Sequence, residues 1–391
     1  MSAYLDHAAT TPLRPEARDA WLATAEDLGN ASSVHGAGQR ARRLLEEARE
    51  AIAEGLGCDP IEIVLTSGGT ESINLALKGL WWARNTGDAI VLPDGEHHAT
   101  MEAVAWLAAT EGAAVRGVPI DSTGRIDASA WTAALSGAAV ATALVANNEV
   151  GTIQDVDSLA AAAAASGTAL HLDAVGAVGH VALSFARLRG DAAPGTGLLA
   201  MSVSGHKLGA PVGTGALVVS RHAALSPLVH GGGQQRGIRS GTQDVAGAAA
   251  MAAALTATLS GRADEERRVA GLRDLLWAGI HTAAPGIEML GDPDHRLSGN
   301  LHLLLPGADG ETMLFLLDQA GISVATGAAC QAGVTEPSHV VMAMGRDERA
   351  ARSVLRLTLG RTTTAADVDA VVSALPDAYR RASRARSGQR S

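Results

Sequence analysis

The chain has 391 residues, of which 47% are hydrophobic and 18% charged, so it can bury a sizeable core and is not globally disordered. Acidic residues exceed basic ones by 41 to 31, and the net charge of -10 argues against a binder of nucleic acids or anionic membranes. The most apolar stretches, residues 159–165 and 245–259, are shorter than the roughly 18 residues that cross a bilayer. The first 11 residues resemble no secretion leader, and two distant cysteines without CxxC spacing predict a cytoplasmic location and no metal site.

From residue 36 to 220 the chain alternates between helical and strand-like segments. Helical spacing of apolar residues predicts helices over 36–57, 70–84, 97–110 and 156–166. Short apolar runs predict strands over 61–66, 89–92, 139–145, 168–172, 200–203 and 215–219. Continuous apolar strands separated by helices predict an α/β fold whose mostly parallel sheet is covered on both faces.

The later part of the chain has a different pattern. A long helical region over 244–283 is followed by strands at 299–305 and 354–359 and helices at 311–320 and 365–384. This pattern indicates a smaller α+β lobe. We therefore predict a large domain over residues 15–255 and a small domain formed by residues 1–14 and 256–391. Residues 380–391 are basic and serine-rich, and we expect them to fray.

Polar groups follow several of the predicted strands, at the carboxyl ends where open parallel sheets bind ligands. They lie at residues 67–70, 96–98, 147–149, 173 and 204–207. The glycine-rich run that ends at Thr70 is compatible with a phosphate cradle, and also with an ordinary turn and helix cap. A polar residue after one strand would more often be a helix cap or a satisfied buried group. Polar residues after several adjacent strands favour a ligand site.

The two lysines of the chain, Lys78 and Lys207, are its only side-chain amines. Lys78 lies in a helical run, where a solvated lysine is ordinary. Lys207 lies in a glycine-bounded loop between strands, in the same set of strand ends as the cradle and Asp173. Pyridoxal phosphate needs an amine for a Schiff base, an acid beside its pyridine nitrogen, and donors for its phosphate, and these residues would provide all three. The alternative is that Lys207 is a loop lysine that binds anions.

The motifs together resemble the cysteine desulfurases, which belong to the class V aminotransferase group of fold-type I pyridoxal-phosphate enzymes. The resemblance extends over nearly the whole chain and rests on residues 4–12, 66–72, 147–151, 204–207, 231–236, 239–242, 325–330 and 355–361. It implies a homodimer in which the large domain carries the cofactor. The small domain would then carry Cys330 and Arg356.

For the cofactor, the resemblance implies a set of binding residues. Lys207 would form the Schiff base, Asp173 would contact the pyridine nitrogen, and His97 would stack on the ring and serve as an acid or base. Thr242 would reach the phosphate across the homodimer interface. The remaining residues would hold the phosphate or lie beside the phenolic oxygen: Gly69, Thr70, Ser204, His206 and Asn148. The family has a glutamine three residues after the aspartate, where this chain has Gly176.

For the substrate, the resemblance implies that L-cysteine lies near Asn148, with its carboxylate on Arg356. Cys330 would take the sulfur as a persulfide and leave L-alanine. The loop after Cys330 resembles a subgroup that supplies sulfur to iron–sulfur scaffolds or tRNA-thiolation enzymes. The small-residue segment 325–333 suits a mobile nucleophile loop, and the alternative is an inert cysteine. Rival functions are another class V enzyme, such as an aminotransferase or selenocysteine lyase, or a non-catalytic assembly subunit.

Overall fold

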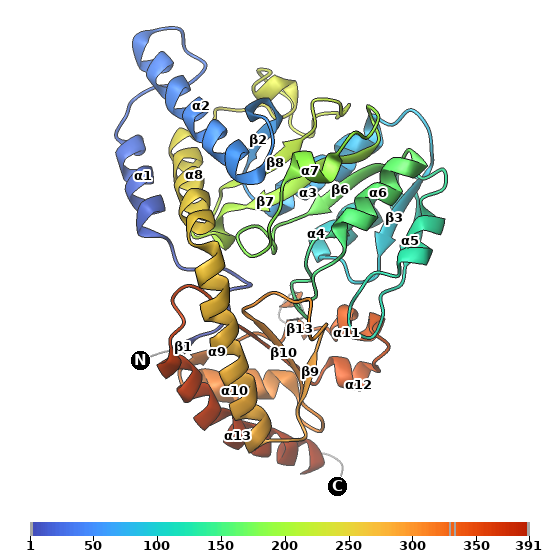
Figure 1. Ribbon diagram of the computed structural model, residues 1–391, viewed down its shortest axis with the longest axis vertical. Helices are drawn as coiled ribbons and strands as arrows, with labels where there is room; N and C mark the ends of the chain where they lie inside the picture. The colour runs from blue at the N-terminus through green and yellow to red at the C-terminus, as the bar shows by residue number, and fades with distance from the viewer. Residues whose placement is uncertain (1–2, 328–329, 332–333, 389–391) are drawn as a thin grey trace.

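The computed structural model describes residues 3–327, 330–331 and 334–388, arranged as an upper and a lower part (Figure 1). The upper part is built on a seven-stranded sheet, in the order β2 (Ile63–Thr66), β8 (Gly215–Val219), β7 (Gly197–Ser204), β6 (Ala169–Asp173), β5 (Val140–Leu144), β3 (Ala89–Pro93) and β4 (Ala114–Val118). Neighbours from β7 to β4 pair in parallel, and β8 runs antiparallel to both β7 and β2. The predicted mostly parallel sheet is confirmed.

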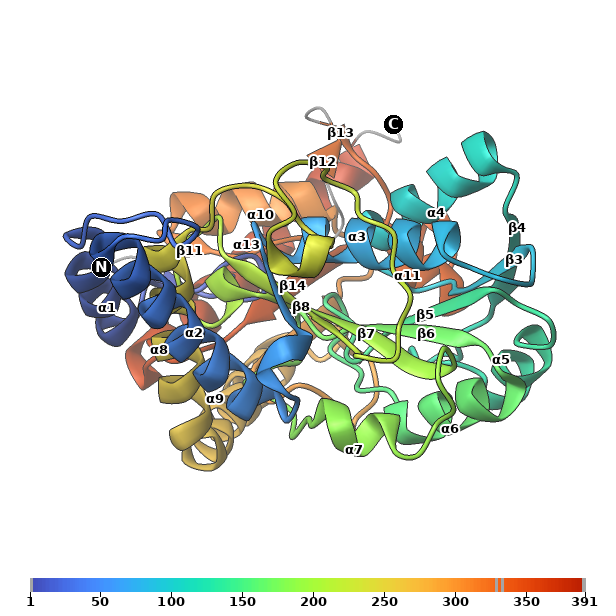
Figure 2. The same ribbon diagram turned by 90° about the horizontal axis from the view of Figure 1, so that it is seen from above.

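Helices cover both faces of this sheet, because its central strands are apolar on both sides. All residues of β5, β7 and β8 are buried. One face packs against α3 (Gly69–Trp82) and α4 (His98–Glu111) (Figure 2). The other face packs against α2 (Gly36–Leu56), α5 (Ala128–Ala134), α6 (Val156–Ser166), α7 (Phe185–Arg189) and α8 (Val245–Ser260). Helix α1 (Pro15–Ala25) lies on α8.

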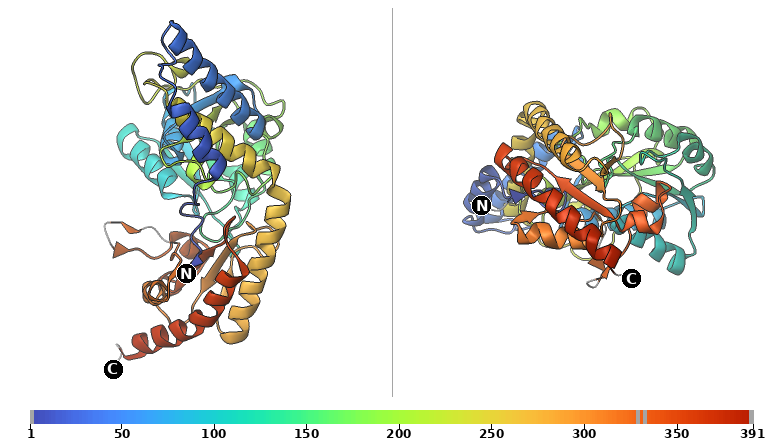
Figure 3. Two further views of the ribbon diagram at one scale, coloured as in Figure 1. Left: turned by 90° about the vertical axis from the view of Figure 1, so that its left-hand side faces the viewer. Right: turned by 90° about the horizontal axis from the view of Figure 1, so that it is seen from below.

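The lower part is built on an antiparallel sheet in the order β14 (Val354–Thr358), β10 (Asn300–Leu304) and β9 (Glu288–Leu290). Its core includes residues of α9 (Arg262–Ala283), α10 (Gly310–Gln319) and α13 (Ala365–Gly388). Strand β1 (Ala3–Tyr4) pairs in parallel with β11 (Ile322–Ser323), so the start of the chain joins this part. Figure 3 shows α8 and α9, in yellow and orange, running from the upper part to the lower. The predicted boundaries at residues 14/15 and 255/256 stay a prediction.

The remaining elements are short. They are the helices α11 (His339–Ala343) and α12 (Glu348–Ala351), the hairpin strands β12 (Cys330–Gln331) and β13 (Val334–Thr335), and the 3₁₀ helices η1 (Pro60–Glu62), η2 (Gly205–Lys207) and η3 (Gln235–Gly237). Within the described ranges, no helix is both long and apolar enough to cross a membrane.

Two sequence expectations are corrected by the structure. The helical region predicted over 244–283 is two helices, α8 and α9, which meet at Gly261. The predicted loose tail is helical as far as it is described, because α13 continues to Gly388. Residues 389–391 of that prediction lie outside the described residues. Ala378 and Ala382 on this helix are buried in the lower core, and that packing stabilises a segment whose composition alone is typical of a loose end.

Candidate active site

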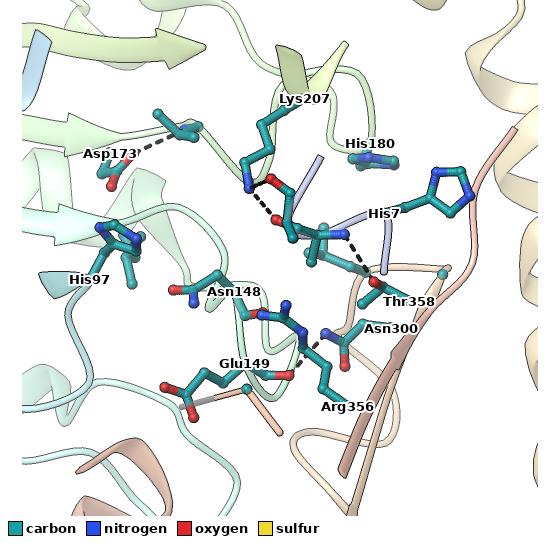
Figure 4. A pocket seen from close by; sticks show the side chains of 18 of the residues that line it. His7, His97, Asn148, Glu149, Asp173, His180, Lys207, Asn300, Arg356 and Thr358 are labelled. Carbon is teal, nitrogen blue, oxygen red and sulfur yellow. Dashed lines mark hydrogen bonds between the residues drawn. The ribbon is translucent and has the colours of Figure 1, made fainter. Parts of the chain in front are cut away.

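A cavity of about 430 Å³ lies at the carboxyl edge of the large sheet, where the upper and lower parts meet (Figure 4). Parallel strands end at this edge, so residues far apart in the sequence come together here. Many of the residues singled out in the sequence line it: Thr70, His97, Asn148, Asp173, His206, Lys207 and Arg356.

Lys207 enters the cavity from η2, directly after the buried strand β7. Its Nζ donates to the backbone oxygens of Ala8 and Ala9, the latter at 2.9 Å (Figure 4). Burial and the positive charge of Arg356 lower the pKa of this amine to about 8. A lysine with a lowered pKa offers more of the neutral, nucleophilic amine near neutral pH. The other lysine, Lys78, lies on α3 over the ring of Trp106.

Asp173 is the last residue of β6, and His97 follows β3, which is separated from β6 by β5. Asp173 is 2% exposed, and its Oδ1 accepts the backbone N–H of Val175 at 2.9 Å. Burial raises its pKa to about 6, so it is a carboxylate at neutral pH. His97 is the N-cap of α4, and its Nδ1 accepts the N–H of Ala99. Burial and Lys207 lower its pKa to about 4, so the ring is neutral. Because Nδ1 accepts a hydrogen bond, the proton of the neutral ring is on Nε2.

The start of α3 provides donors for an anion. Its N-cap is Gly68, with a φ of 146°, and among the described residues no side chain caps this helix. The first backbone N–H groups, of Gly69 and Thr70, therefore remain available. A Cβ at Gly69 would lie 2.8 Å from a methyl of Val175, which is too close for an unmoved contact. Glycine therefore allows the backbone at this position to lie directly against Val175. Beside it, the Oγ of Ser204 is buried and has no hydrogen-bond partner in the described part of the chain.

These features fit pyridoxal phosphate. An unpaired buried hydroxyl and free helix N–H groups suit its phosphate, and the buried Asp173 suits a protonated ring nitrogen. His206 also lines the cavity, with its Nδ1 3.2 Å from the Oγ1 of Thr10. Gly176 lines it as well, and a Cβ there would meet only the Ala146 oxygen, at 3.7 Å.

Arg356 enters from the lower part, on strand β14, and its side chain is only 7% exposed. Its Nη1 donates to the backbone oxygen of Asn148, and its Nη2 donates to Oδ1 of Asp6, each at 2.9 Å. Its Nε is buried and unpaired within the ranges that the structure covers. A guanidinium held in this way keeps free donors for a carboxylate.

Among the predicted site residues with described side chains or backbone, Gly69, Ser204 and Thr242 do not line this cavity, although Gly69 directly precedes the lining residue Thr70. Thr242 lines a separate cavity of about 160 Å³, together with Ser67 and Gln235. The backbone of Cys330 pairs with Thr335 in the β12–β13 hairpin. The side chain of Cys330, and residues 328–329 and 332–333 of its loop, lie outside the described residues.

Two buried glutamates had no role assigned from the sequence: Glu149, which lines this cavity, and Glu96, which does not line it but directly precedes the lining residue His97. Glu149 is 2% exposed, accepts a hydrogen bond from the Oγ of Ser338, and has a pKa raised by burial to about 7. Glu96 accepts the N–H of Leu144 at 2.7 Å, and burial raises its pKa to about 8, with Asp173 adding to the effect. Both residues follow predicted strands, and this position is the feature of the sequence that could have indicated a place near the site. Their burial depends on segments that pack from elsewhere in the chain.

Comparison with known proteins identifies the family. The class-V aminotransferase family matches residues 3–371. The chain is 46% identical to an IscS-like cysteine desulfurase of Mycobacterium tuberculosis, over 98% of each chain. It is 40% identical to a cysteine desulfurase of Cereibacter sphaeroides, over 95% of this chain and 94% of that protein.

Solved structures agree with these relatives. A NifS-like protein superposes with a TM-score of 0.88 at 30% identity, over 96% of this chain and 99% of that one. DndA of Streptomyces lividans superposes with a TM-score of 0.75 at 34% identity, over 90% of this chain and 98% of that one. Enzymes of this family depend on pyridoxal phosphate, for which the cavity has a matching amine, acid and anion cradle. The chain belongs to the class-V aminotransferase family, and within it to the cysteine desulfurases.

Proposed function

We propose that this chain binds pyridoxal phosphate at Lys207, takes the sulfur of L-cysteine onto Cys330 as a persulfide, and releases L-alanine. The observation that carries the proposal is that one cavity combines a half-buried amine, a buried carboxylate and a buried guanidinium: Lys207, Asp173 and Arg356. The first two suit the cofactor and the third suits the carboxylate of an amino acid.

Each cofactor-facing residue has a distinct task in this proposal. Lys207 would bind the cofactor's aldehyde carbon, and Asp173, a carboxylate above pH 6, would keep the ring nitrogen protonated. Gly69, Thr70, Ser204 and His206 would hold the phosphate. The cofactor, when bound, would supply the electron sink that weakens the bond between the substrate's Cβ and its sulfur.

The sulfur transfer balances without any further reactant. The thiolate of Cys330 would attack the substrate sulfur, so that an S–S bond forms as the Cβ–S bond breaks. The electron pair stays with the substrate, whose Cβ takes a proton and becomes the methyl group of alanine. Lys207, with a pKa near 8, and the neutral His97, which carries a proton on Nε2, both line the cavity and would move the protons.

The test is to incubate the purified, cofactor-loaded protein with L-cysteine and to measure alanine and protein-bound sulfane sulfur. The Cys330→Ser variant should keep the cofactor's colour and lose the persulfide, because serine does not accept sulfur. Cys58→Ser is the matched control, since Cys58 is half-buried and burial raises its thiol pKa to about 12. Normal persulfide formation by Cys330→Ser would contradict the proposal. A requirement for a keto-acid acceptor would indicate an aminotransferase instead, and activity on selenocysteine alone would indicate a lyase.

The same proposal includes a cytoplasmic homodimer that passes its sulfur to an acceptor protein. Thr242 supports the dimer, because it lies in a cavity separate from that of Lys207 and would reach the phosphate of a second copy. The loop after Cys330 supports an iron–sulfur scaffold or a tRNA-thiolation enzyme as the acceptor. Light scattering would measure the oligomeric state, and transfer of ³⁵S from loaded enzyme to each purified acceptor would separate the two.

A further inference from the structure

The N-terminal segment Asp6–Ala9 contacts both cations of the active site. Lys207 donates its Nζ hydrogen bonds to the backbone oxygens of Ala8 and Ala9. Arg356 donates from Nη2 to the carboxylate of Asp6 at 2.9 Å. Two groups that the proposed function assigns to cofactor and substrate are thus held by one short stretch of chain, about 200 and 350 residues away in the sequence.

This segment is itself firmly positioned. The backbone of Asp6 pairs with Thr358 in parallel, and the N–H of Ala8 donates to the Oγ1 of Thr358 at 2.9 Å (Figure 4). Leu5 is fully buried in the lower core, and the hydroxyl of Tyr4 donates to the backbone oxygen of Asp6 at 3.1 Å. The Asp6 carboxylate, 20% exposed, is therefore a fixed point rather than a free surface charge.

The contacts of Arg356 leave some of its N–H donors unused and available to a second anion. A guanidinium has five N–H donors, and in the described structure one is used by Asn148 and one by Asp6. Its Nε also lacks a partner among the described residues, but it is buried, so the donors left for a ligand are the second N–H groups of Nη1 and Nη2. An arginine side chain loses considerable rotational freedom when it binds a ligand, and less is lost if the side chain is already held in place.

We propose that Asp6 is a positioning residue that holds the Arg356 guanidinium ready for the carboxylate of the amino-acid substrate. The inference rests on the proposed role of Arg356 and adds how that role is achieved. Asp6 acts through its hydrogen bond to Nη2, and its own charge is not what the substrate recognises. An amide at this position, which still accepts that hydrogen bond, should therefore serve almost as well.

The binding test uses the cofactor-loaded enzyme with two amines followed by absorbance: L-alanine, which has a carboxylate, and ethylamine, which has none. Asp6→Ala should weaken L-alanine binding roughly tenfold, and Asp6→Asn by less than about threefold, since a hydrogen bond to a charged group is worth about one to two decades in affinity. Ethylamine binding should be unchanged in both variants. Undiminished or tighter L-alanine binding by Asp6→Ala would overturn the inference, because Asp6 would then only compete with the substrate.

A second readout needs neither cofactor nor turnover. Reductive ¹³C-methylation labels the chain's two lysines, so NMR can follow Lys207 with Lys78 as an internal control. Asp6 raises the pKa of Lys207, while Arg356 lowers it and Asp173 also raises it. Loss of the Asp6 charge should thus lower the pKa of Lys207 in both variants and leave Lys78 unchanged. If the Lys207 signal titrates as in the parent protein, the Asp6 carboxylate does not lie in this site and the inference fails.

Arg356→Ala separates the inference from the proposed function. If this variant loses the preference for L-alanine over ethylamine while Asp6→Ala keeps it, only the role of Asp6 is wrong. If Arg356→Ala keeps the preference, Arg356 does not bind the substrate carboxylate, and the roles of Arg356 and Asp6 fall together. Persulfide formation on Cys330 tests the proposed function separately. Thermal unfolding of each variant establishes that the fold is retained. The backbone pairing of Asp6 with Thr358 does not depend on the side chain that is changed.

Discussion

Gly176→Gln introduces a side-chain amide at the position where the resemblance to the cysteine desulfurases implies a glutamine and this chain has none. Gly176 lines the cavity with Lys207 and Asp173, in the turn that follows β6. A Cβ at this position would meet only the backbone oxygen of Ala146, at 3.7 Å, which is an ordinary contact distance. The residue has no positive φ, so a side chain here causes no backbone strain. The substitution should therefore act through its amide alone.

The size of the effect follows from one hydrogen bond to the cofactor's phenolic oxygen. A neutral bond contributes about 0.5–1.5 kcal/mol and a bond to a charged acceptor about 1.5–3 kcal/mol. At about 1.4 kcal/mol per decade, cofactor affinity should rise roughly 2- to 10-fold, or up to about 100-fold if the oxygen is charged. The amide also favours the deprotonated oxygen, so the pH at which the bound cofactor changes colour should fall.

The assay combines cofactor dissociation with a spectral pH titration of the parent protein and the variant. Gly176→Ala is the matched control, because it adds the Cβ without the amide and should change neither quantity. Unchanged affinity and an unchanged titration, with the glutamine seen to point at the ring, would refute the reasoning. Asn148 or a water would then already occupy the role of the missing amide.

The remaining predictions address the lysine, a buried acid and the dimer. Lys207→Ala should abolish the borohydride-reducible cofactor adduct and Lys78→Ala should not; a labelled peptide that contains Lys78 would reverse this assignment. Glu96 has a folded pKa of about 8 against an ordinary value of 4.5, so the native state keeps a proton that the unfolded chain releases, and stability falls as pH rises from 4.5 to 8. Glu96→Gln should therefore leave the free energy of unfolding of the apoprotein unchanged near pH 4.5 and raise it by a few kcal/mol above pH 8. Urea titrations at both pH values would measure this difference. Equal pH dependence in both proteins would exclude a buried neutral Glu96. Thr242→Ala should weaken activity. A hybrid dimer of one Thr242→Ala subunit and one Lys207→Ala subunit should contain one fully intact site with parent-like KM. A hybrid that behaves like Thr242→Ala would show that Thr242 serves its own subunit.

The upper part of the fold could be predicted from the sequence because its signals are local. Strand β3 is a continuous apolar run, and β5 and β7 are apolar apart from Thr142, Ser202 and Ser204. A strand buried on both faces needs a mostly apolar composition wherever it lies. Because parallel strands end at one edge, the polar residues after them could be expected to meet. His97, Asn148, Asp173 and Lys207 do line one cavity. The edge strand β4, with mostly exposed residues, lacks this signal and was not predicted.

Contacts between distant segments were decided by the tertiary structure alone. Asp6 and Arg356 are 350 residues apart, and Ser338 and Glu149 are 189 apart, so no local pattern could indicate either pair. Burial likewise depends on what packs from elsewhere, and burial is what lowers the pKa of Lys207 and raises the pKa of Glu96 and Glu149. Residue types and their order along the chain determined which groups are present in the site. Tertiary packing decided which of these groups touch one another, which remain without a hydrogen-bond partner and which hold a proton.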